Sequence, residues 1–486
     1  MSALKSYFDK TAERWYEVSD RIWSFSELKF DEYQSAKLLA DELAQVGFEI
    51  ELGIAGIPTA FKASYGKGEP VIAILAEYDA LSGMSQCADV DYPLKRHGTE
   101  NGHGCGHHLL GTASAAAAAA IKDYMMQHET LKGSVIVYGC PGEEGGSGKA
   151  FMARAGVFQA VDAALTWHPG THNGVFSAFS LANYQVYFRF EGVSAHAAAS
   201  PHLGRSALDA VELMNIGVNY LREHMISEAR IHYAVTNTGG FSPNVVQSEA
   251  EVLYLIRAPK LSEVEALYQR VCDVASGAAL MTGTKVTVVF DKACSDYMPN
   301  VTLGQVISDK MLAIGAPQFS KEDELTAESI RKTLSQADIE TDMAQAKQMM
   351  GALSDVMMPS YQKKCLADCV IPYDVSPQRL SGSTDVGDVS QLVPTAQCFA
   401  ACASIGTPMH TWQMVSQGKS GIAHKGMRYA AEVLAAAVVE LLEHPEKIEE
   451  AKAEHLKSLN GNSYQSPIPA DVMPKIIAKN GMLSNK

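Results

Sequence analysis

The stretch "VIAILAEYDAL" (residues 71–81) decides the fold that we expect for this chain. It opens with six apolar residues, a pattern typical of a strand that is buried on both faces of a parallel sheet. The run ends in acidic residues, so this strand would present Asp79 at its carboxyl end. An alanine-rich segment, residues 114–127, follows and predicts a helix whose small side chains permit close packing on the sheet.

The same plan, an apolar strand followed by polar residues, occurs twice more along the chain. It is found in "GSVIVYGCPGEEGG" (133–146) and in "DAALTWHPG" (162–170). The order of strand, helix and strand predicts an α/β fold, with a mostly parallel sheet and helices on both faces. In such a fold the site lies along the carboxyl edge of the sheet.

The pattern changes over residues 184–297, where alternating strands and two helices follow one another. "NYQVYFRFEG" (183–192) has the alternation of a half-buried strand, and the order of the elements predicts an inserted, ferredoxin-like α+β domain. Residues 1–183 and 298–486 would then form one catalytic domain around it. The polar, helical stretch 318–363 is expected to cover one edge of that domain as a further insertion.

Composition excludes several classes of partner. The chain has 486 residues, a length that favours two domains, and its formal net charge is −15. It has no run of Lys or Arg, which argues against nucleic acid or an anionic membrane as a partner. We expect no membrane-spanning segment and no signal core. Nine scattered cysteines suggest no disulfide framework, and the expected location is the cytoplasm.

Metal-binding residue types gather at the predicted strand ends. "HGCGHHLLG" (103–111) alone contains three histidines and a cysteine. Thiolate, imidazole and carboxylate are the ligand set of a Zn- or Mn-class divalent ion. The parallel sheet would bring these residues to one edge: Asp79, Cys105, His107, Glu143, Glu144 and His168.

The adjacent pair Glu143–Glu144 is the most informative local feature. Neighbouring side chains of an extended backbone point in opposite directions, so one carboxylate can bind a metal while the other handles a proton. A phosphate-binding loop is disfavoured, because Lys149 is followed by Ala150 and two carboxylates would repel phosphate. A Cys–His hydrolase built on Cys105 stays open as an alternative, although it would not need paired glutamates.

These motifs resemble the M20 family of metallopeptidases and amidohydrolases, and most closely its branch that cleaves N-acyl amino acids. The matching stretches are "AEYDAL", "GCGHH", "GCPGEEGG", "WHPG", "GVSAHAAASP", "NVVQSEAEVLYLIRAP" and "IAHKGM". The resemblance implies metal-dependent hydrolysis of an amide, with aminobenzoyl-glutamate as the expected substrate. Two alternatives remain: a dipeptidase on the same scaffold, and a subunit that is inactive without a related A subunit.

The resemblance also implies a site with two divalent ions, Mn or Zn. Its ligands would be Cys105, His107, Glu144, His168 and His424. Glu143 would be the general base, and Asp79 would orient an imidazole. His410 in "MHTWQ" is the rival of His424, which is preferred because a helix follows it. His108 departs from the family's C-G-H-D pattern, and its role is open.

For the inserted domain, the resemblance implies a lid that also forms a homodimer. His196 would then stabilise the oxyanion, in its own subunit or in the partner's site. Asn244 and Arg257 match family positions that hold the substrate carboxylate, for which the planar fork of Arg is well suited. The alternative for Arg257 is an ordinary exposed strand residue.

Overall fold

The computed structural model describes residues 2–375, 378–380 and 382–475. Its centre is a seven-stranded sheet with the order β1-β2-β4-β3-β5-β13-β6. The four central strands are mutually parallel: β4 (Gly133–Gly139), β3 (Val71–Ala76), β5 (Ala163–Gly170) and β13 (Thr395–Ala401). The strands β1 (Glu49–Leu52), β2 (Phe61–Lys67) and β6 (Gly174–Val175) pair antiparallel at the two edges. The predicted α/β fold with a mostly parallel sheet is confirmed.

The central strand β3 is buried on both faces, as its apolar run predicts. Ile72 and Ile74 belong to the core on one face, whereas Ala73 and Leu75 belong to the core on the other. The helices that pack over the first face are α1 (Ser2–Phe25), α2 (Tyr33–Gln45), α3 (His107–Gln127), α8 (Val301–Ile314) and α14 (Gly421–Glu443). The second face is covered by α5 (Gly148–Arg154) and α12 (Val386–Ser390).

The alanine run of α3 lies in the middle of this packing. Ala115–Ala120 are all at most 3% exposed, and α3 lies against α1, α14 and the sheet. Small side chains let these helix backbones approach closely, so the interior is filled by well-packed methyl groups. The amino end of α3, which carries His107, is thereby fixed at the carboxyl edge of the sheet.

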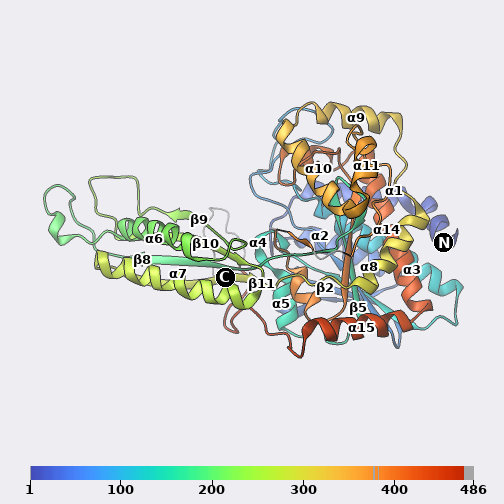
Figure 1. Cartoon of the computed structure of the whole chain (residues 1–486), viewed down its shortest axis with the longest axis horizontal. Coiled ribbons are helices and arrows are strands. Elements are labelled where there is room, and N and C mark those ends of the chain that lie inside the picture. The colour runs from blue at the N-terminus through green and yellow to red at the C-terminus, as the bar shows by residue number, and fades with distance from the viewer. Residues whose placement is uncertain (1, 376–377, 381, 476–486) are drawn as a thin grey trace.

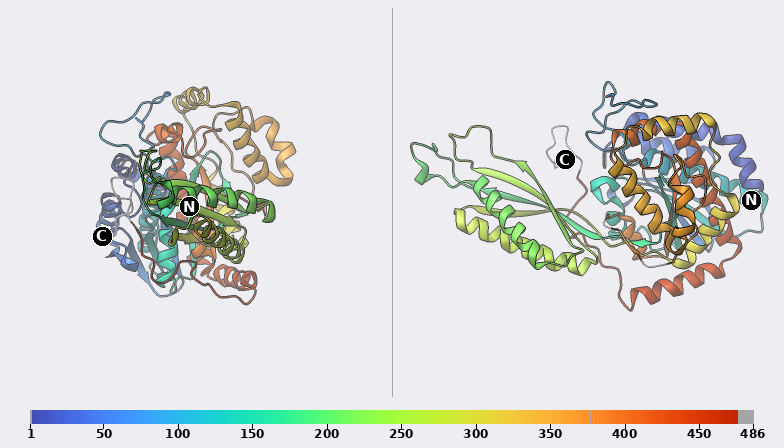
Figure 2. Two further views of the ribbon diagram at one scale, coloured as in Figure 1. Left: turned by 90° about the vertical axis from the view of Figure 1, so that its left-hand side faces the viewer. Right: turned by 45° about the horizontal axis from the view of Figure 1, so that its top comes forward.

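A long, narrow lobe projects from this body (Figures 1 and 2). Its elements are β8 (Ala182–Glu191), α6 (Ala207–Leu221), β9 (Arg230–Asn237), β10 (Glu249–Ala258), α7 (Leu261–Thr282) and β11 (Lys285–Cys294). They form an antiparallel sheet of order β11-β8-β10-β9 with both helices packed against it. The order of strand, helix, two strands, helix and strand is that of the ferredoxin-like prediction. The domain boundaries at 183/184 and 297/298 and the lid role stay predictions.

The stretch 318–363 forms helices at the top of the body in Figure 1. They are α9 (Lys321–Arg331), α10 (Gln336–Met350) and α11 (Ser354–Tyr361). The shorter elements and the last helix are η1 (Ile54–Gly56), α4 (Glu143–Gly146), β7 (Ala178–Phe179), η2 (Pro201–Leu203), η3 (Arg222–His224), η4 (Gly351–Leu353), β12 (Gln378–Arg379), α13 (Trp412–Gln417) and α15 (Glu446–Leu459). None of the described helices is long and apolar enough to cross a membrane.

Candidate active site

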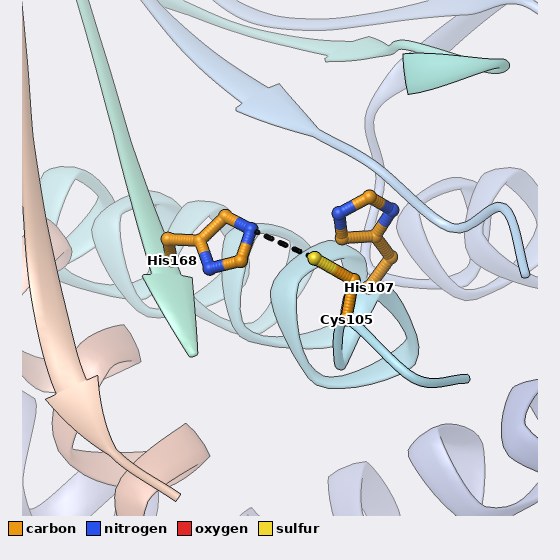
Figure 3. A group of neighbouring side chains, drawn as sticks. All are labelled: Cys105, His107 and His168. Carbon is orange, nitrogen blue, oxygen red and sulfur yellow. Dashed lines mark hydrogen bonds between the residues drawn. The ribbon is translucent and has the colours of Figure 1, made fainter. Parts of the chain in front are cut away.

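Three of the predicted ligands meet where β5 ends and α3 begins (Figure 3). One ligand atom each of Cys105, His107 and His168 lies within 4.8 Å of the others, and Cys105 Sγ is 3.6 Å from His168 Nε2. Gly106 makes this turn possible because its φ is +77°, and a Cβ there would come within 2.9 Å of Pro169. The predicted C-G-H turn therefore points a thiol and an imidazole at one place.

The paired glutamates complete the cluster from the end of β4. His107, Glu143 and Glu144 form a second group of donor atoms within 4.8 Å of one another. Cys105, Glu144 and His410 form a third group, in which His410 Nε2 is 3.0 Å from Glu144 Oε1. Because Cys105, His107 and Glu144 each belong to two of the three groups, the groups make one continuous array of sulfur, nitrogen and oxygen donors.

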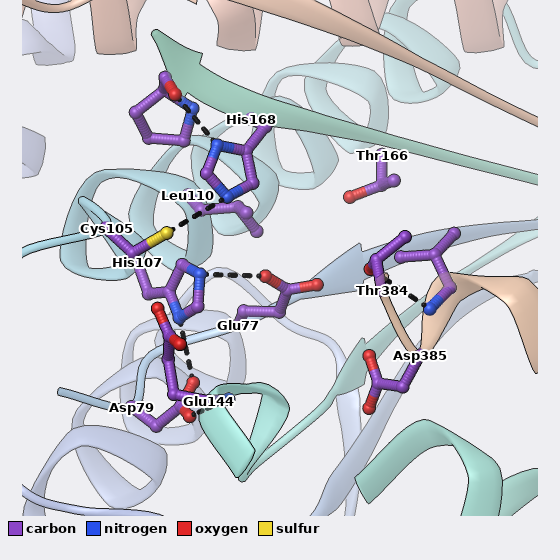
Figure 4. Close-up of polar contacts among 12 residues, drawn as sticks. Glu77, Asp79, Cys105, His107, Leu110, Glu144, Thr166, His168, Thr384 and Asp385 are labelled. Atoms are coloured by element: carbon purple, nitrogen blue, oxygen red, sulfur yellow. Dashed lines mark hydrogen bonds and ion pairs between the residues drawn. The ribbon is translucent and has the colours of Figure 1, made fainter. Parts of the chain in front are cut away.

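Asp79 links the two halves of this array (Figure 4). Its Oδ1 is 2.9 Å from His107 Nδ1, and its Oδ2 accepts the backbone N–H of Glu144 at 2.7 Å. A carboxylate on Nδ1 fixes the imidazole ring and leaves Nε2 as the atom that can bind a metal. The strand "VIAILAEYDAL" thus delivers the acid that orients both His107 and the glutamate turn.

Glu77, to which the sequence alone assigns no function, contacts the same histidine (Figure 4). Glu77 Oε2 lies 3.3 Å from His107 Nε2, and neither buried atom has a hydrogen-bond partner among the described residues. Two such atoms facing each other fit a site that a cation completes. A signal existed in the sequence: Glu77 and Asp79 are two apart in extended backbone, so both side chains face the same side.

A buried lysine balances the charge of Glu77. Lys149 Nζ lies 2.6 Å from Glu77 Oε1 and 2.5 Å from Asp385 Oδ1, and the three side chains are at most 2% exposed. Burial lowers the pKa of Lys149, but the carboxylates of Asp385 and Glu77 outweigh it and hold that pKa well above its usual value. The ammonium therefore stays charged beside the cluster. From the sequence alone, Asp385 had no feature that distinguished it from a turn residue.

Glu143 lies at the start of α4, directly before Glu144. Burial raises the pKa of its carboxyl well above the usual value, and the negative charges of Glu77 and Glu144 add to this effect. A carboxylate with raised proton affinity is better matched to accepting and returning a proton near neutral pH. The two adjacent glutamates thus have different environments, as their different predicted roles require.

A segment from the amino-terminal part of the chain holds the glutamate turn in place. Lys29 Nζ donates to Gly145 O at 2.6 Å, and Glu32 Oε1 accepts the N–H of Gly142 at 2.9 Å. The ring of Phe30 occupies the space that a Cβ on Gly142 would need, at 2.9 Å. Gly142 and Gly145 both have positive φ, so the turn requires glycine and is clamped by residues 29–32.

The structure places His410 beside the cluster, whereas His424, the candidate that the sequence prefers, lies away from it. His424 is the fourth residue of α14, and its ring stacks on Tyr16 and lies 2.9 Å from Asp20 Oδ1, on the side of the helix that faces α1. His410 has a positive φ, and its N–H donates to Gly104 O at 2.8 Å, which ties its loop to the C-G-H turn. The helix that the sequence predicts after His424 is present, but it directs that ring away from the sheet edge.

His108 does not join the cluster. Its Nε2 lies 2.8 Å from Gly418 O, its ring neighbours that of His103, and both rings are fully buried. Burial lowers the pKa of His108 well below the usual value, so the ring is neutral. The extra imidazole joins the start of α3 to the loop before α14.

Two of the predicted residues of the lobe lie far from the cluster of their own chain. His196 and Asn244 lie in neighbouring loops at the outer end, where Ala197 N donates to Asn244 O at 3.0 Å. The strand β8 leads there from the body over ten residues, a length of about 30 Å. Both side chains are exposed.

Arg257, in contrast, lies at the base of the lobe, opposite Asn183 of β8. It is half-buried, and its Nε has no hydrogen-bond partner among the described residues. Burial lowers the pKa of its guanidinium, and the negative charge of Glu143 opposes this shift. The alternative of an ordinary exposed strand residue does not fit this position.

A cavity of about 510 Å³ opens onto the cluster. Cys105, Glu143, Glu144, His168 and His410 line one side of it. Further lining comes from the segment after His168, from β13, from residues around β7, from the loop 382–384, from the loop before His410 and from α10. A space of this size next to the donor array can hold a small molecule.

Comparison with known proteins agrees with this architecture. Residues 73–410 match the family model of peptidase family M20/M25/M40. The chain is 50% identical to the B subunit of p-aminobenzoyl-glutamate hydrolase from Escherichia coli (strain K12), over 95% of this chain and 96% of that protein. It is 32% identical to the Xaa-Arg dipeptidase of Mus musculus, over 65% of this chain and 71% of that protein.

Among solved structures, an aminobenzoyl-glutamate utilization protein from Klebsiella pneumoniae has the same fold. Its TM-score is 0.59 at 17% identity, with 91% of this chain and 98% of that chain covered. The family match spans Asp79, the C-G-H turn, the paired glutamates and His410. The chain therefore belongs to peptidase family M20/M25/M40.

Proposed function

We propose that this chain is a metal-dependent amidohydrolase that cleaves the amide bond of an N-acyl amino acid, with aminobenzoyl-glutamate as the substrate. The observation that carries the proposal is the single array of donors at the sheet edge beside a cavity. The name of the E. coli relative supports aminobenzoyl-glutamate as the substrate. The name of the mouse relative keeps a dipeptidase as the second candidate.

Two divalent ions, Mn or Zn, fit the donors that the fold brings together. The proposed ligands are Cys105, His107, Glu144, His168 and His410. Such ions lower the pKa of water and polarise a carbonyl. Burial raises the pKa of the Cys105 thiol, so the thiolate form needs a neighbouring cation to stabilise it. Binding of a metal ion to Cys105 would therefore release a proton.

The chain's own residues supply the proton transfer and the positioning. Glu143 takes the proton from the attacking water and returns it to the nitrogen of the leaving amino acid. Asp79 keeps His107 and the backbone of Glu144 in fixed positions during this proton transfer. We assign Arg257 to the substrate carboxylate, and its buried Nε without a hydrogen-bond partner among the described residues supports this role.

His196 and Asn244 lie too far from their own cluster to act there, so we assign them to the site of a second copy. In a homodimer that pairs the outer end of one lobe with the body of its partner, His196 would donate to the oxyanion. The E. coli relative is named as the B subunit of its enzyme, which supports a related A subunit as another partner. Activity of the purified chain alone distinguishes the two arrangements.

The test is release of glutamate from aminobenzoyl-glutamate by the purified chain, reloaded with Mn or Zn, with a chelated control. Glu143→Ala is expected to keep its metal content and to lose a factor of about 10²–10⁴ in kcat. Glu144→Ala is the contrasting variant, because it should lose metal together with activity. A Glu143→Ala protein that turns over at the wild-type rate would refute the role of Glu143. A wild-type chain without bound metal and without activity would refute the function.

A further inference from the structure

The helix α10 forms one wall of the cavity beside the cluster. Asp338, Thr341, Asp342, Gln345 and Met349 line it; Thr341 and Asp342 are adjacent, and each is three or four residues from Asp338 and Gln345, so the five lie on one side of the helix. The adjacent face packs into a small separate core through Met343, Ala346 and Met350. One face of the helix therefore packs into this core, and the other lines the cavity.

Asp342 fixes this wall to the two segments that carry proposed ligands. Its Oδ1 accepts the hydroxyl of Thr171 at 2.6 Å, three residues after His168. Its Oδ2 accepts the N–H of Gly406 at 2.6 Å, in the loop that leads to His410. The position of α10 is thus fixed relative to the cluster. Its side chains can therefore limit the length and shape of a group that binds there.

Two aromatic residues, Phe176 and Phe399, also line the cavity. The ring centroids of His168 and Phe399 are 6.2 Å apart, and those of Phe399 and Phe176 are 5.3 Å apart. Met349 of α10 reaches the strand next to Phe176, since its Cε would lie 2.8 Å from a Cβ on Gly174. A flat ring can therefore lie on Phe399 and Phe176 with Met349 against its edge, while Gln345 offers an amide one turn along the helix.

We propose that α10 is the element that selects the acyl group, and that it favours an aryl ring bearing a hydrogen-bond donor. Met349 packs on the ring, Gln345 accepts from the donor, and Asp342 is a positioning residue that acts through the helix. The inference rests on the proposed amide hydrolysis, because it assigns the acyl side of that substrate to this wall. It predicts that aromatic and small acyl groups respond differently to changes in α10.

The first experiment compares kcat/KM for aminobenzoyl-, benzoyl- and acetyl-glutamate. Met349→Ala is expected to lower kcat/KM for both aroyl substrates about tenfold relative to kcat/KM for acetyl-glutamate. Gln345→Leu should lower kcat/KM for aminobenzoyl-glutamate about tenfold relative to kcat/KM for benzoyl-glutamate. Lys347→Ala, an exposed position on the same helix, is the matched control and should leave all three ratios unchanged. Equal effects on the three substrates, or none, would overturn the proposal.

A binding measurement separates this inference from the proposed function. Calorimetric titration with p-aminobenzoate needs no turnover and is run on the metal-loaded wild type and on each variant that keeps the wild-type melting temperature. If Gln345→Leu or Met349→Ala binds p-aminobenzoate more weakly and Lys347→Ala binds it as the wild type does, the role of α10 in selecting the acyl group is supported, even if no amide is cleaved. Wild-type affinity in both variants, or no binding by the wild type, overturns it.

Discussion

The backbone of His410 shows how one residue's conformation sets the composition of the site. Its φ of +60° lies in the left-handed region, which few residues other than glycine adopt. The conformation persists because the N–H of His410 is held by Gly104 O and the ring is held by Glu144. A loop residue without any periodic pattern around it thereby comes to face Cys105.

This placement predicts that His410 and His424 differ in their effect on metal binding. His410→Ala is expected to lower the metal content of the purified chain and to reduce turnover by at least about tenfold. His424→Ala removes a contact with Asp20 on the surface of α1 and should leave the metal content unchanged. Metal analysis of both dialysed variants decides the matter. Loss of metal in His424→Ala alone would make His424 the ligand instead.

The sequence locates candidate site residues best where they follow a strand or precede a helix. Glu144 and His168 can be chosen because apolar runs locate the strands and parallel strands end at one edge, and Cys105 can be chosen because it precedes the alanine-rich helix. His410 is the less favoured candidate by sequence, because no strand or helix leads to it. The ion pair between Lys149 and Asp385 joins residues that are 236 positions apart in the sequence, and no local sequence pattern predicts a contact over such a separation.

Among the elements, α14 is joined to two neighbouring helices by one carboxylate. Glu440 of α14 accepts from Lys310 of α8 at 2.6 Å and also from Lys447 of α15. These two hydrogen bonds hold the pKa of Glu440 at about 2, below its usual value of 4.5. Since the pKa of the folded state is the lower one, the stabilisation is complete above pH 4.5 and is lost as the pH falls toward 2.

Glu440→Gln is therefore expected to destabilise the chain in a pH-dependent way. At pH 7 the free energy of unfolding should fall by less than about 1 kcal/mol, because the group is near the surface and partly screened by solvent. The difference from wild type should shrink as the pH falls from about 4.5 to about 3 in urea unfolding. Glu450→Gln, at an exposed position on α15, is the control. A deficit that stays constant over this acid range would assign the effect to packing instead.

The element order of the whole chain was predictable because it depends on periodicity. Alternation marked the strands of the lobe, and the carboxyl edge of the main sheet followed from its parallel strands. The wall formed by α10 could not be derived in this way. Its helical period was visible, but the face that meets the cavity depends on contacts with Thr171 and Gly406, which lie far away in the sequence.

At the scale of the molecule, the lobe separates residues that are proposed to act on one substrate. The cluster lies in the body, whereas His196 and Asn244 lie at the outer end of a strand about 30 Å long. A site that uses both must combine two chains. In the proposed homodimer, symmetry would give each chain one complete site, with the lobe of one chain contributing to the site of the other.

Mixing two inactive variants tests this arrangement. Glu143→Ala and His196→Ala chains, unfolded together and refolded, should form mixed dimers in which one of the two sites is intact, and about a quarter of wild-type activity should return. The control mixture, Glu143→Ala with Glu144→Ala, has both changes in the body and should recover nothing. If mixed dimers form and stay inactive, His196 does not act across the interface.

The spread of the donors along the chain has a consequence for biosynthesis. Asp79, Cys105, Glu144 and His168 lie in the first half of the sequence, but His410 lies close to the end of it. A ribosome-bound chain can fold its first strands and still lack one proposed ligand until residue 410 has been synthesised. Metal loading would then be a late event, and prematurely terminated chains would not become active hydrolases in the cell.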